Sequence, residues 1–408
     1  MQWIRRVVFF VLLVACVAGT GSAETLVFWS SGYPLEVQDL LRSSVFPKFE
    51  AEHGVTIEYK EIGWGGPRDE QLFVALAAGV GPDVYVNGTE DWAIPLDDYV
   101  NAWDEAENIP QGFWDIARWM SRGQLLYVPQ IVEIRGYAYN ERLFLEAGLG
   151  TDAPGSWDEM LAYVRKLTRL DDANRRVLQS GFETDWRVPY VANEYDWFVQ
   201  QAGTHLTTPD MTKSLINTPE AIAALEYMVE LYLIAHPPGY EPVDRFEFHR
   251  GGVAITRGLV STKQGVEEAS PDDVKYFRLF APRRDENTRP VAPTYVNGLS
   301  ISQGSSNKDL AWEFIKYMLS VDVQEQFAEV GKIMVARQEV ATNTALESTA
   351  WFAPWYQISS YAAPVGVLGN RTGLANLIRD ALNQTISPGE AVVRMAEVHQ
   401  VALDRLYG

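Results

Sequence analysis

The sequence predicts an α/β protein of two domains, and three observations lead to this prediction. The chain has 408 residues, which is too long for a single hydrophobic core, so two domains are expected. From residue 25 onward, apolar runs that favour strands alternate with helical periodicities, a pattern typical of parallel strands joined by crossover helices. The third observation is the apolar, β-favouring run 129–140, which predicts a strand that carries charged residues.

The charged residues of the run 129–140 allow two interpretations. Side chains alternate between the faces of a strand, so Glu133 and Arg135 share a face with Tyr137, opposite Val132 and Ile134. Buried charges are costly unless they are paired or serve a function. Glu133 and Arg135 therefore form an ion pair at a sheet edge, or the strand crosses between two lobes and presents polar groups to a cleft.

The elements before this run alternate between strand and helix. A helix is expected over 35–52, because apolar residues repeat at i, i+4 spacing from Val37 and Gly54 ends it. Another helix is expected from Pro67, a favoured first helical residue, to Gly79. Strands are expected at 25–29, 55–60 and 84–86. This alternation predicts a parallel sheet with crossover helices.

The elements after the run follow similar signals. A short helix is expected over 140–148, and a capping box of Ser156 and Glu159 opens a helix that reaches about residue 168. Thr218 caps a further helix and Asn307 opens another. The segment 353–373 is rich in proline, glycine and aromatic residues and is expected to be irregular. The other predictions are strands at 251–255, 276–280 and 298–302 and helices at 374–382 and 388–406.

Composition and charge limit the partners. The chain is 47% hydrophobic and 22% charged, which is usual for a globular protein. Its formal net charge is −20, which argues against nucleic acid or an anionic membrane surface as partner, because both need basic patches. The charge suits a neutral or cationic ligand.

Residues 1–23 have the pattern of an export signal. Arg5 and Arg6 precede an apolar run over 7–17 and the small residues 21–23, and the run is too short to span a bilayer as a stable helix. Cys16 is the single cysteine, so no disulfide forms within the chain. Cleavage after Ala23 would release a soluble protein, whereas residues 13–16 (LVAC) resemble a bacterial lipobox that would retain the protein through a lipidated Cys16. We favour soluble release.

Motifs of catalysis and cofactor binding are missing from the sequence. The chain contains no phosphate loop, no dinucleotide fingerprint and no Gly-x-Ser-x-Gly elbow. Its histidines are scattered at no metal-ligand spacing: His53, His205, His236, His249 and His399. We therefore expect no enzyme, no metal site and no cofactor.

Aromatic residues are abundant, with 13 Trp, 19 Tyr and 17 Phe. Most must belong to the core, but several tryptophans fall in predicted loops beside glycine and polar residues. Indole rings stack on the apolar faces of sugars, whose hydroxyl rims need carboxylates, amides or arginine. Tryptophans at the carboxyl ends of strands therefore predict a saccharide cleft. The candidates are Trp29, Trp64, Trp92, Trp186, Trp197 and Trp355.

Five stretches, taken in order, resemble a known family. They are 76–84 (LAAGVGPDV), 94–99 (IPLDDY), 139–159 with YN, AGL and SWDE, 248–255 (FHRGGVAI), and 297–314 with NGLSI and AWEF. With the export signal and the first strand, they make residues 25–408 similar to the extracellular solute-binding proteins of bacterial ABC sugar importers. The resemblance is greatest to the maltose-binding-like members, family 1.

The resemblance implies the type II periplasmic-binding-protein fold, with two α/β lobes joined by crossing strands that close on a ligand. We place lobe one at residues 24–131 and 277–330. Lobe two is placed at residues 132–276 and 331–408. The ligand cleft is expected between them.

The resemblance also implies ligand contacts. Glu133 matches a family acid that binds sugar hydroxyls, and the loop after strand 84–86 matches the site of an aromatic and polar contacts. The family's tryptophan after the strand at 251–255 is missing, so Trp355 or Trp186 is expected to replace it. Apart from the tryptophans already named, the expected ligand-binding residues are Asn87, Glu90, Asp91, Glu133, Arg135, Glu194, Tyr195, Asn297 and Arg371.

The predicted function is capture of a carbohydrate, expected to be an oligosaccharide, and its delivery to the membrane permease of an ABC transporter. The protein is expected to be a monomer in the periplasm or on the extracellular face. Two alternatives remain: the same fold binding a glycerol phosphate or a polyamine, or an exported glycan-active enzyme. An anion needs clustered basic residues, for which only Arg135 and Arg257 are suggestive, whereas Glu133, Glu194 and Asp91 would attract a polyamine.

Overall fold

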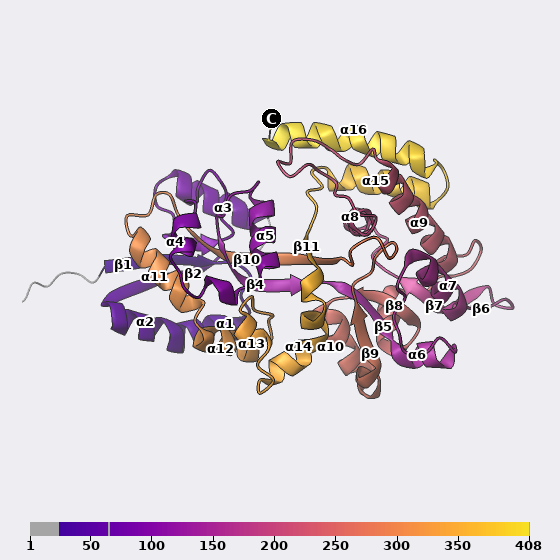
Figure 1. Ribbon diagram of the computed structural model, residues 1–408, viewed down its shortest axis with the longest axis horizontal. Coiled ribbons are helices and arrows are strands. Elements are labelled where there is room, and N and C mark those ends of the chain that lie inside the picture. Colours follow the sequence, from indigo (N-terminus) through magenta and orange to yellow (C-terminus); the bar gives the residue numbers. More distant parts are fainter. Residues whose placement is uncertain (1–23, 64–65, 408) are drawn as a thin grey trace, which may run out of the picture.

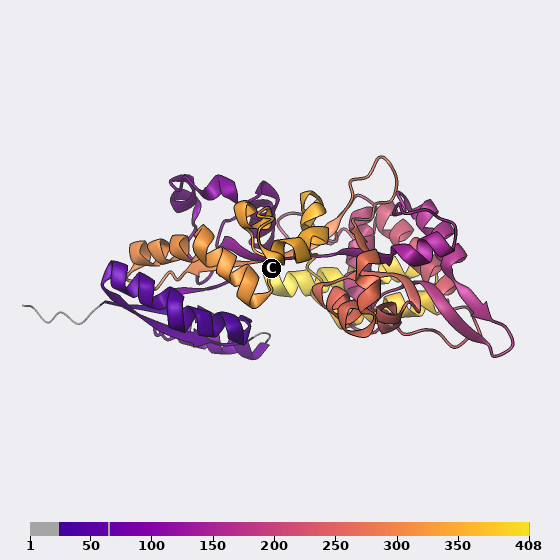
Figure 2. The same ribbon diagram turned by 90° about the horizontal axis from the view of Figure 1, so that it is seen from below.

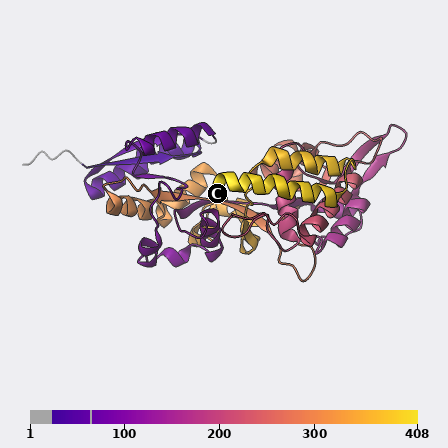
Figure 3. The same ribbon diagram turned by 90° about the horizontal axis from the view of Figure 1, so that it is seen from above.

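The computed structural model describes residues 24–63 and 66–407 (Figure 1). Two β-sheets lie side by side along the long axis of the molecule, each flanked by helices. Views from below and above show an elongated protein with one sheet toward each end (Figures 2 and 3). The predicted α/β class is confirmed. The predicted export signal with Cys16, and the candidate Trp64, lie outside the described residues.

The first sheet has the strand order β11-β10-β3-β1-β2, and β4 also pairs with β10. Strands β2 and β3 run parallel to β1, whereas β10 runs antiparallel to β3 and β4. The strands are β1 (Glu24–Ser30), β2 (Val55–Glu61), β3 (Val84–Val86), β4 (Val128–Ile134), β10 (Ala292–Ile301) and β11 (Ala362–Pro364). The strands predicted at 25–29, 55–60 and 84–86 are present, and the parallel arrangement holds for this part of the sheet.

Helices from both parts of the chain cover the first sheet. The predicted helix 35–52 is continuous but contains a π-helical turn, Leu41–Val45, between α1 (Leu35–Leu40) and α2 (Phe46–His53). The other helices of this lobe are α3 (Gly66–Ala77), α4 (Asp97–Asn101), α5 (Gln111–Met120), α11 (Lys308–Met318), α12 (Val321–Gly331), α13 (Gln338–Ala341) and α14 (Glu347–Gln357). Phe28, Phe49 and Phe314 are fully buried in the core between sheet and helices.

The second sheet has the order β6-β7-β8-β5-β9. Its strands are β5 (Gly136–Asn140), β6 (Arg169–Asp171), β7 (Arg176–Glu183), β8 (Val253–Gly258) and β9 (Phe277–Phe280). Its helices are α6 (Glu141–Glu146), α7 (Trp157–Leu167), α8 (Val191–Gln201), α9 (Pro219–Ala235), α10 (Val260–Ala269), α15 (Arg371–Leu382) and α16 (Pro388–Tyr407). Tyr137, Phe182 and Phe198 are buried in a separate core.

The run 129–140 crosses between the two sheets. It forms β4 in the first sheet and β5 in the second, and Arg135 is the one residue between the two strands. The chain also passes between the sheets from β9 to β10 and from β11 to α15. Side chains on this run therefore lie where the lobes meet.

The sheets divide the chain differently from the predicted lobe boundaries. Strand β9, placed in lobe one by the sequence, pairs with β5 in the second sheet. Residues 331–364 were placed in lobe two, but Val335 and Phe352 are buried in the first core and β11 pairs with β10. Sequence patterns fix elements but do not show which of two cores an apolar face joins.

Local capping follows the sequence in most places. The Ser156 hydroxyl accepts from the Glu159 backbone N–H at 3.2 Å, but the Glu159 carboxylate accepts from Gly155 rather than from Ser156. The capping box is thus half formed, and the Thr218 hydroxyl caps α9 as predicted. The segment 353–373 is less irregular than predicted, because it contains the end of α14 and strand β11.

Close packing of β10 on β4 gives the first prediction. A Cβ added to Gly298 would lie 2.2 Å from the Val128 carbonyl oxygen and 2.7 Å from Tyr127 Cδ2. Overpacking of this kind costs about 1–3 kcal/mol. We expect Gly298→Ala to lower the free energy of unfolding by that amount in urea titrations.

Gly389 provides the matched control for this prediction. It lies in the first turn of α16, and a Cβ there would meet no atom within 4 Å. Gly389→Ala should be neutral or stabilising by up to about 1 kcal/mol, since alanine favours helix. Equal unfolding midpoints for the two variants would contradict the packing argument.

Candidate functional site

A cleft of about 610 Å³ opens where the two lobes meet. The first lobe contributes side chains from β4 and β10, and the second contributes the loop after β7, the start of α8, the end of β8 and the first residue of α15. Its walls are mainly charged and polar. The lining residues are Glu133, Arg135, Asp185, Arg187, Tyr190, Asn193, Arg245, Arg257, Leu259, Tyr295, Asn297 and Arg371.

The crossing strand supplies a fixed ion pair to this cleft. Arg135 donates from Nε and Nη2 to Oε1 of Glu133 at 2.9 and 2.8 Å. Its guanidinium also lies 4.2 Å from the ring centroid of Tyr295 on β10. The ion pair of Glu133 and Arg135 predicted by one interpretation is therefore present, and it lies at the cleft predicted by the other.

Asn297 is held on β10 by the loop that follows β3. Its Oδ1 accepts from Nδ2 of Asn87 at 2.7 Å, and Oδ1 of Asn87 accepts from the backbone N–H of Gly298. Asn87 has a left-handed backbone, with φ of 54°, which asparagine tolerates better than most residues. Asn87 therefore positions a cleft residue without lining the cleft itself.

Two arginines converge on Asp185 in the second lobe. Arg187 donates to both carboxylate oxygens of Asp185 at 2.8 Å, and Nη1 of Arg245 lies 3.3 Å from Oδ2. Burial alone would raise the pKa of Asp185, but its bonds to Arg187 and the charge of Arg245 hold the pKa below its usual value. Asp185 therefore stays ionised and orients both guanidinium groups.

A buried ion pair forms the floor of the cleft. Nη1 of Arg257 lies 2.8 Å from Oε1 of Glu194, and the two side chains are 11% and 2% exposed. The Thr184 hydroxyl donates to the other Glu194 oxygen at 2.6 Å. Burial raises the pKa of Glu194, and the Arg257 charge offsets part of this effect. Nε of Arg257 is buried and has no hydrogen-bond partner among the described residues.

Arg371 is the least engaged cation of the cleft. It is the first residue of α15, whose N-cap is Asn370. Within the described part of the chain, no carboxylate forms an ion pair with Arg371. Arg371 was expected at the site, and it lies at the cleft together with Glu133, Arg135 and Asn297.

Other predicted residues surround the cleft or lie elsewhere. Trp29 sits under Lys60, whose Nζ is 4.2 Å from the indole, in a separate hollow beside α3. Glu90 pairs with Arg122, Asp91 is exposed, and Trp92 packs partly buried against the first core. The structure does not bring these residues to the cleft.

The tryptophans proposed as replacement platforms have packing roles. Trp355 is 0% exposed, and its Nε1 donates to the Gly258 carbonyl at 2.9 Å, so it cannot stack on a ligand. Trp186 donates to the buried Glu183 at 2.9 Å. Tyr195 is likewise enclosed and donates to the Ala221 carbonyl. The prediction that Trp355 and Tyr195 contact a ligand is wrong, because tertiary packing encloses both side chains. The sequence pattern does not show this packing.

Glu194 and Trp197 lie directly behind the cleft. They line a hollow of about 30 Å³ that shares Arg135, Arg257 and Tyr295 with the cleft. Trp197 is buried and donates from Nε1 to the Val291 carbonyl at 3.3 Å. Both residues therefore support the cleft wall from inside the second lobe.

Several lining residues were not predicted as ligand contacts. They are Asp185, Arg187, Tyr190, Asn193, Arg245, Leu259 and Tyr295, together with Arg257, which was named for an anionic ligand alone. Tyr295 could have been found, because it is two residues before Asn297 on one strand face. Arg245 begins a short 3-10 helix, Arg245–Arg250, which was not predicted from the sequence.

Two other kinds of feature, a cluster of metal ligands and a membrane-spanning helix, are not found in the part of the chain that the structure describes. No group of three or more His, Cys, Asp or Glu side chains among them could hold a metal ion. None of the helices described is long and apolar enough to span a bilayer. The cleft is therefore defined by arginines, carboxylates, amides and two tyrosines.

A protein-family model and a relative of known sequence both match this chain over most of its length. Residues 35–325 match the family model described as bacterial extracellular solute-binding protein. A binding protein from Brucella abortus is 26% identical over 347 residues, which cover 76% of this chain and 80% of that protein.

Several solved structures have a similar fold. The sugar-binding protein MalE of Xanthomonas citri has a TM-score of 0.77 and 20% identity, covering 94% of this chain and 98% of its own. A cyclic alpha-maltosyl-1,6-maltose binding protein of Arthrobacter globiformis has a TM-score of 0.74 and 19% identity over 94% and 100% of the two chains. An ABC transporter solute-binding protein of Thermotoga lettingae, bound with alpha-D-tagatose, has a TM-score of 0.66 and 24% identity over 93% and 100%.

Buried acids near the cleft give a pH prediction. Burial raises the pKa of Glu183 from its ordinary value of 4.5 to about 8. The folded state therefore holds a proton that the unfolded chain has lost, so the free energy of unfolding falls as pH rises from about 4.5 to about 8. Glu183→Gln should be more stable than the native chain at pH 8.5, on the order of a few kcal/mol, and the difference should shrink toward pH 5. Urea titrations across this range measure it.

The exposed Glu226 of α9 is the matched control. Glu226→Gln should change stability little at any pH, because its side chain is solvated in both states. A Glu183→Gln difference that stays constant from pH 5 to pH 8.5 would contradict the prediction.

Proposed function

This chain belongs to the family of bacterial extracellular solute-binding proteins, and from that premise we propose that it captures a carbohydrate and delivers it to the permease of an ABC transporter. The observation that carries the proposal is the cleft between the lobes, whose walls combine polar side chains with tyrosine rings. Solved relatives of the same fold include receptors for tagatose and for maltose-containing saccharides. The family consists of binding proteins, so the ligand is released unchanged.

Both lobes would hold the ligand at once. Glu133, Tyr295 and Asn297 face the cleft from the first lobe, and Asn193 and Arg371 face it from the second. A ligand that bridges the two walls gains contacts only when the lobes are close, so it shifts the protein toward the closed arrangement. The three chain crossings, at Arg135, between β9 and β10, and between β11 and α15, would form the hinge.

Tyrosine takes the place of the expected tryptophan platforms. Tyr190 is 45% exposed at the cleft, and Tyr295 lies opposite with Arg135 on its face. An exposed phenol ring offers a flat apolar surface to sugar C–H groups and a hydroxyl at its edge. Tyr190 is therefore the best candidate for ring stacking.

The family description also supports a proposal about where the protein acts. An extracellular location agrees with the family description, and we propose that the N-terminal segment directs export, with soluble release favoured over lipidation of Cys16. We further propose that the protein acts as a monomer, since the closing cleft lies within one chain. A polyamine is disfavoured as ligand, because arginines dominate the cleft and would repel it.

The function is tested by binding. A ligand that binds only the folded state raises the melting temperature by mass action, so thermal shift with mono- and oligosaccharides should reveal stabilising sugars, followed by calorimetry. For the best of them, Tyr190→Ala should weaken binding about tenfold, the loss expected for one aromatic contact. The melting temperature without ligand should not change.

Tyr240→Ala is the matched control, because Tyr240 contacts Arg175 and is not among the residues that line the cleft. It should bind as the native chain does. A panel in which every sugar fails while a polyamine stabilises the protein would contradict the proposed function.

A further inference from the structure

We propose that the ligand is an anionic saccharide whose acidic group, a carboxylate or a phosphate, is bound by the arginines of the cleft. This inference rests on the proposed function and names its substrate class. Arg135, Arg187, Arg245, Arg257 and Arg371 all line the cleft, and none of its lining residues is a lysine. This concentration is unexpected in a chain whose net charge is −20.

Most carboxylate oxygens at the cleft are already engaged. Asp185 accepts from Arg187 through both oxygens and Glu194 pairs with Arg257, whereas Glu133 accepts from Arg135 through Oε1 and keeps Oε2 as an acceptor. Sugar hydroxyls that donate hydrogen bonds therefore find few free acceptors here. The wall instead offers donors, and a ligand that brings its own acceptor oxygens fits it better.

Some guanidinium groups have unused capacity. Arg371 forms no ion pair with a described residue, and Nε of Arg257 is buried without a partner. An orphaned buried donor is costly, so a ligand oxygen that reaches it would be strongly favoured. Two further acids near the cleft are committed elsewhere: Asp196 accepts from Gly366, and Asp244 caps Phe246.

The arginines also repel one another. Burial is the main cause that lowers the pKa of Arg245. The charges of Arg187 and Arg257 also lower it, while those of Asp185 and Glu194 raise it. An anion among these three groups would relieve the repulsion.

The choice of arginine over lysine narrows the ligand chemistry. A guanidinium is planar and presents paired N–H groups that match the two oxygens of a carboxylate or phosphate. Several guanidinium groups are held in fixed orientations by their carboxylate partners, as Arg187 is by two bonds to Asp185. The Nε and Nη2 groups of Arg135 and Arg187 already donate to protein carboxylates. The donors that remain for a ligand oxyanion include their Nη1 groups, the buried Nε of Arg257 and the guanidinium of Arg371.

A second hollow extends the site beyond one sugar ring. It measures about 550 Å³ and shares Arg245, Arg257 and Leu259 with the cleft. Ser261, Gln264 and another cation, Arg250, line it. The shared arginines thus stand between two spaces, which suits an acidic oligosaccharide with rings on both sides of the bound acid group.

The test compares saccharides that differ in charge alone. Calorimetry should show that trigalacturonate binds, while its fully methyl-esterified form binds about 10–100-fold more weakly, the range expected for loss of charge-assisted hydrogen bonds. A disaccharide of glucuronate and a hexose phosphate distinguish a carboxylate from a phosphate as the recognised group. Binding of the preferred acid should weaken as salt is raised.

Variants connect the binding to the arginines. Arg371→Gln removes a cation that has no partner to orphan, so the protein should fold normally and bind the preferred acidic saccharide at least tenfold more weakly. Its affinity for the methyl ester should be unchanged. Arg165→Gln is the matched control, since Arg165 lies on α7 in an exposed pair with Glu230, away from the cleft.

Three results would overturn the inference. Neutral oligosaccharides that bind as tightly as acidic ones would refute it while leaving carbohydrate capture intact. Stabilisation by inorganic phosphate or glycerol phosphate alone, without any saccharide, would refute both this inference and the proposed function. An unchanged affinity of Arg371→Gln for the acidic saccharide would show that the arginine cluster is structural.

Discussion

The structure depends on one constraint: a single strand must leave one hydrophobic core and enter another. Residues up to Ile134 belong to the first sheet and residues from Gly136 to the second, so Arg135 alone occupies the junction. Ile134 and Tyr137 on either side of this junction are buried in the two cores, whereas the charged Glu133 and Arg135 line the cleft between the lobes. The pairing of Arg135 with Glu133 and its stacking on Tyr295 satisfy its charge while keeping it in the cleft. The position of the cleft is thus a consequence of how the chain crosses.

The cleft carries several arginines although the protein as a whole is negatively charged, so the carboxylates in direct contact with these arginines determine its properties. Charges are screened over about 8–10 Å at ordinary ionic strength, so surface acids that lie farther away than this act weakly on the arginines of the cleft. The carboxylates that matter are in direct contact, as Asp185 is with Arg187 and Arg245. They orient the guanidinium groups, and orientation lowers the cost of binding because the donors are already in place. The same contacts explain why neutral sugars meet few free acceptors.

Sequence reasoning succeeded where the signal was local. Strand alternation and charge limited Glu133 and Arg135 to an ion pair at a sheet edge or a crossing strand at a cleft, and capping residues such as Thr218 located helix starts. The sequence did not predict correctly which aromatic residues contact a ligand, because this depends on which side chains the fold buries. Trp355 looked like a loop platform, but it fills the contact between α14 and β8. The cleft arginines come from four distant segments, and no sequence spacing links Arg187, Arg245 and Arg371. Only the folded chain brings these residues together.

The packing around the cleft limits how the lobes can separate. On one side, α14 of the first lobe is fastened to the second lobe, since Lys263 donates to the Trp351 carbonyl, Trp351 donates to Glu267, and Trp355 donates to Gly258. On the other side, the end of α16 meets the first lobe through Arg122, whose guanidinium lies 5.0 Å from the Tyr407 ring.

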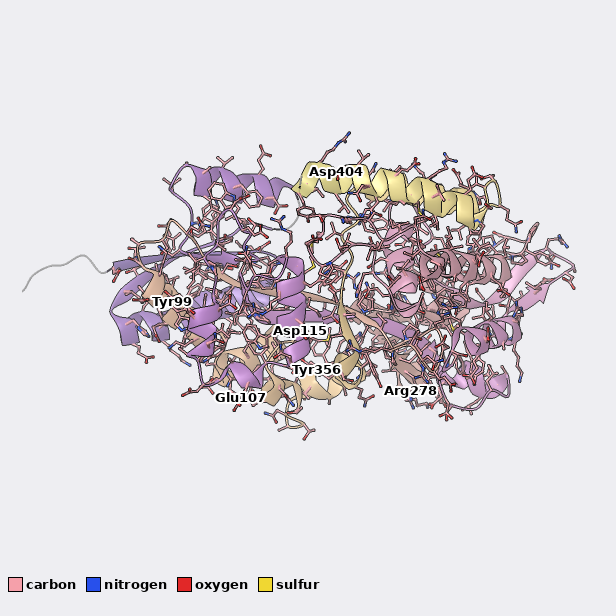
Figure 4. The ribbon with its side chains drawn as sticks, turned by 45° about the horizontal axis from the view of Figure 1, so that its top comes forward. Tyr99, Glu107, Asp115, Arg278, Tyr356 and Asp404 are labelled. Atoms are coloured by element: carbon pink, nitrogen blue, oxygen red, sulfur yellow. The ribbon has the colours of Figure 1, made fainter. Side chains whose placement is uncertain are left out.

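Figure 4 labels both sides: Tyr356, near the end of α14, and Asp404 of α16 lie on opposite sides of the molecule. A rigid-body opening that pivots on the α14 side would keep the three hydrogen bonds there and separate the lobes on the α16 side. The contacts on the α16 side include that of Arg122 with Tyr407 and that of Trp119 with His205, whose ring centroids lie 4.7 Å apart. Each is worth roughly 0.5–1 kcal/mol, so a ligand that makes several contacts to both cleft walls outweighs them in setting the closed population.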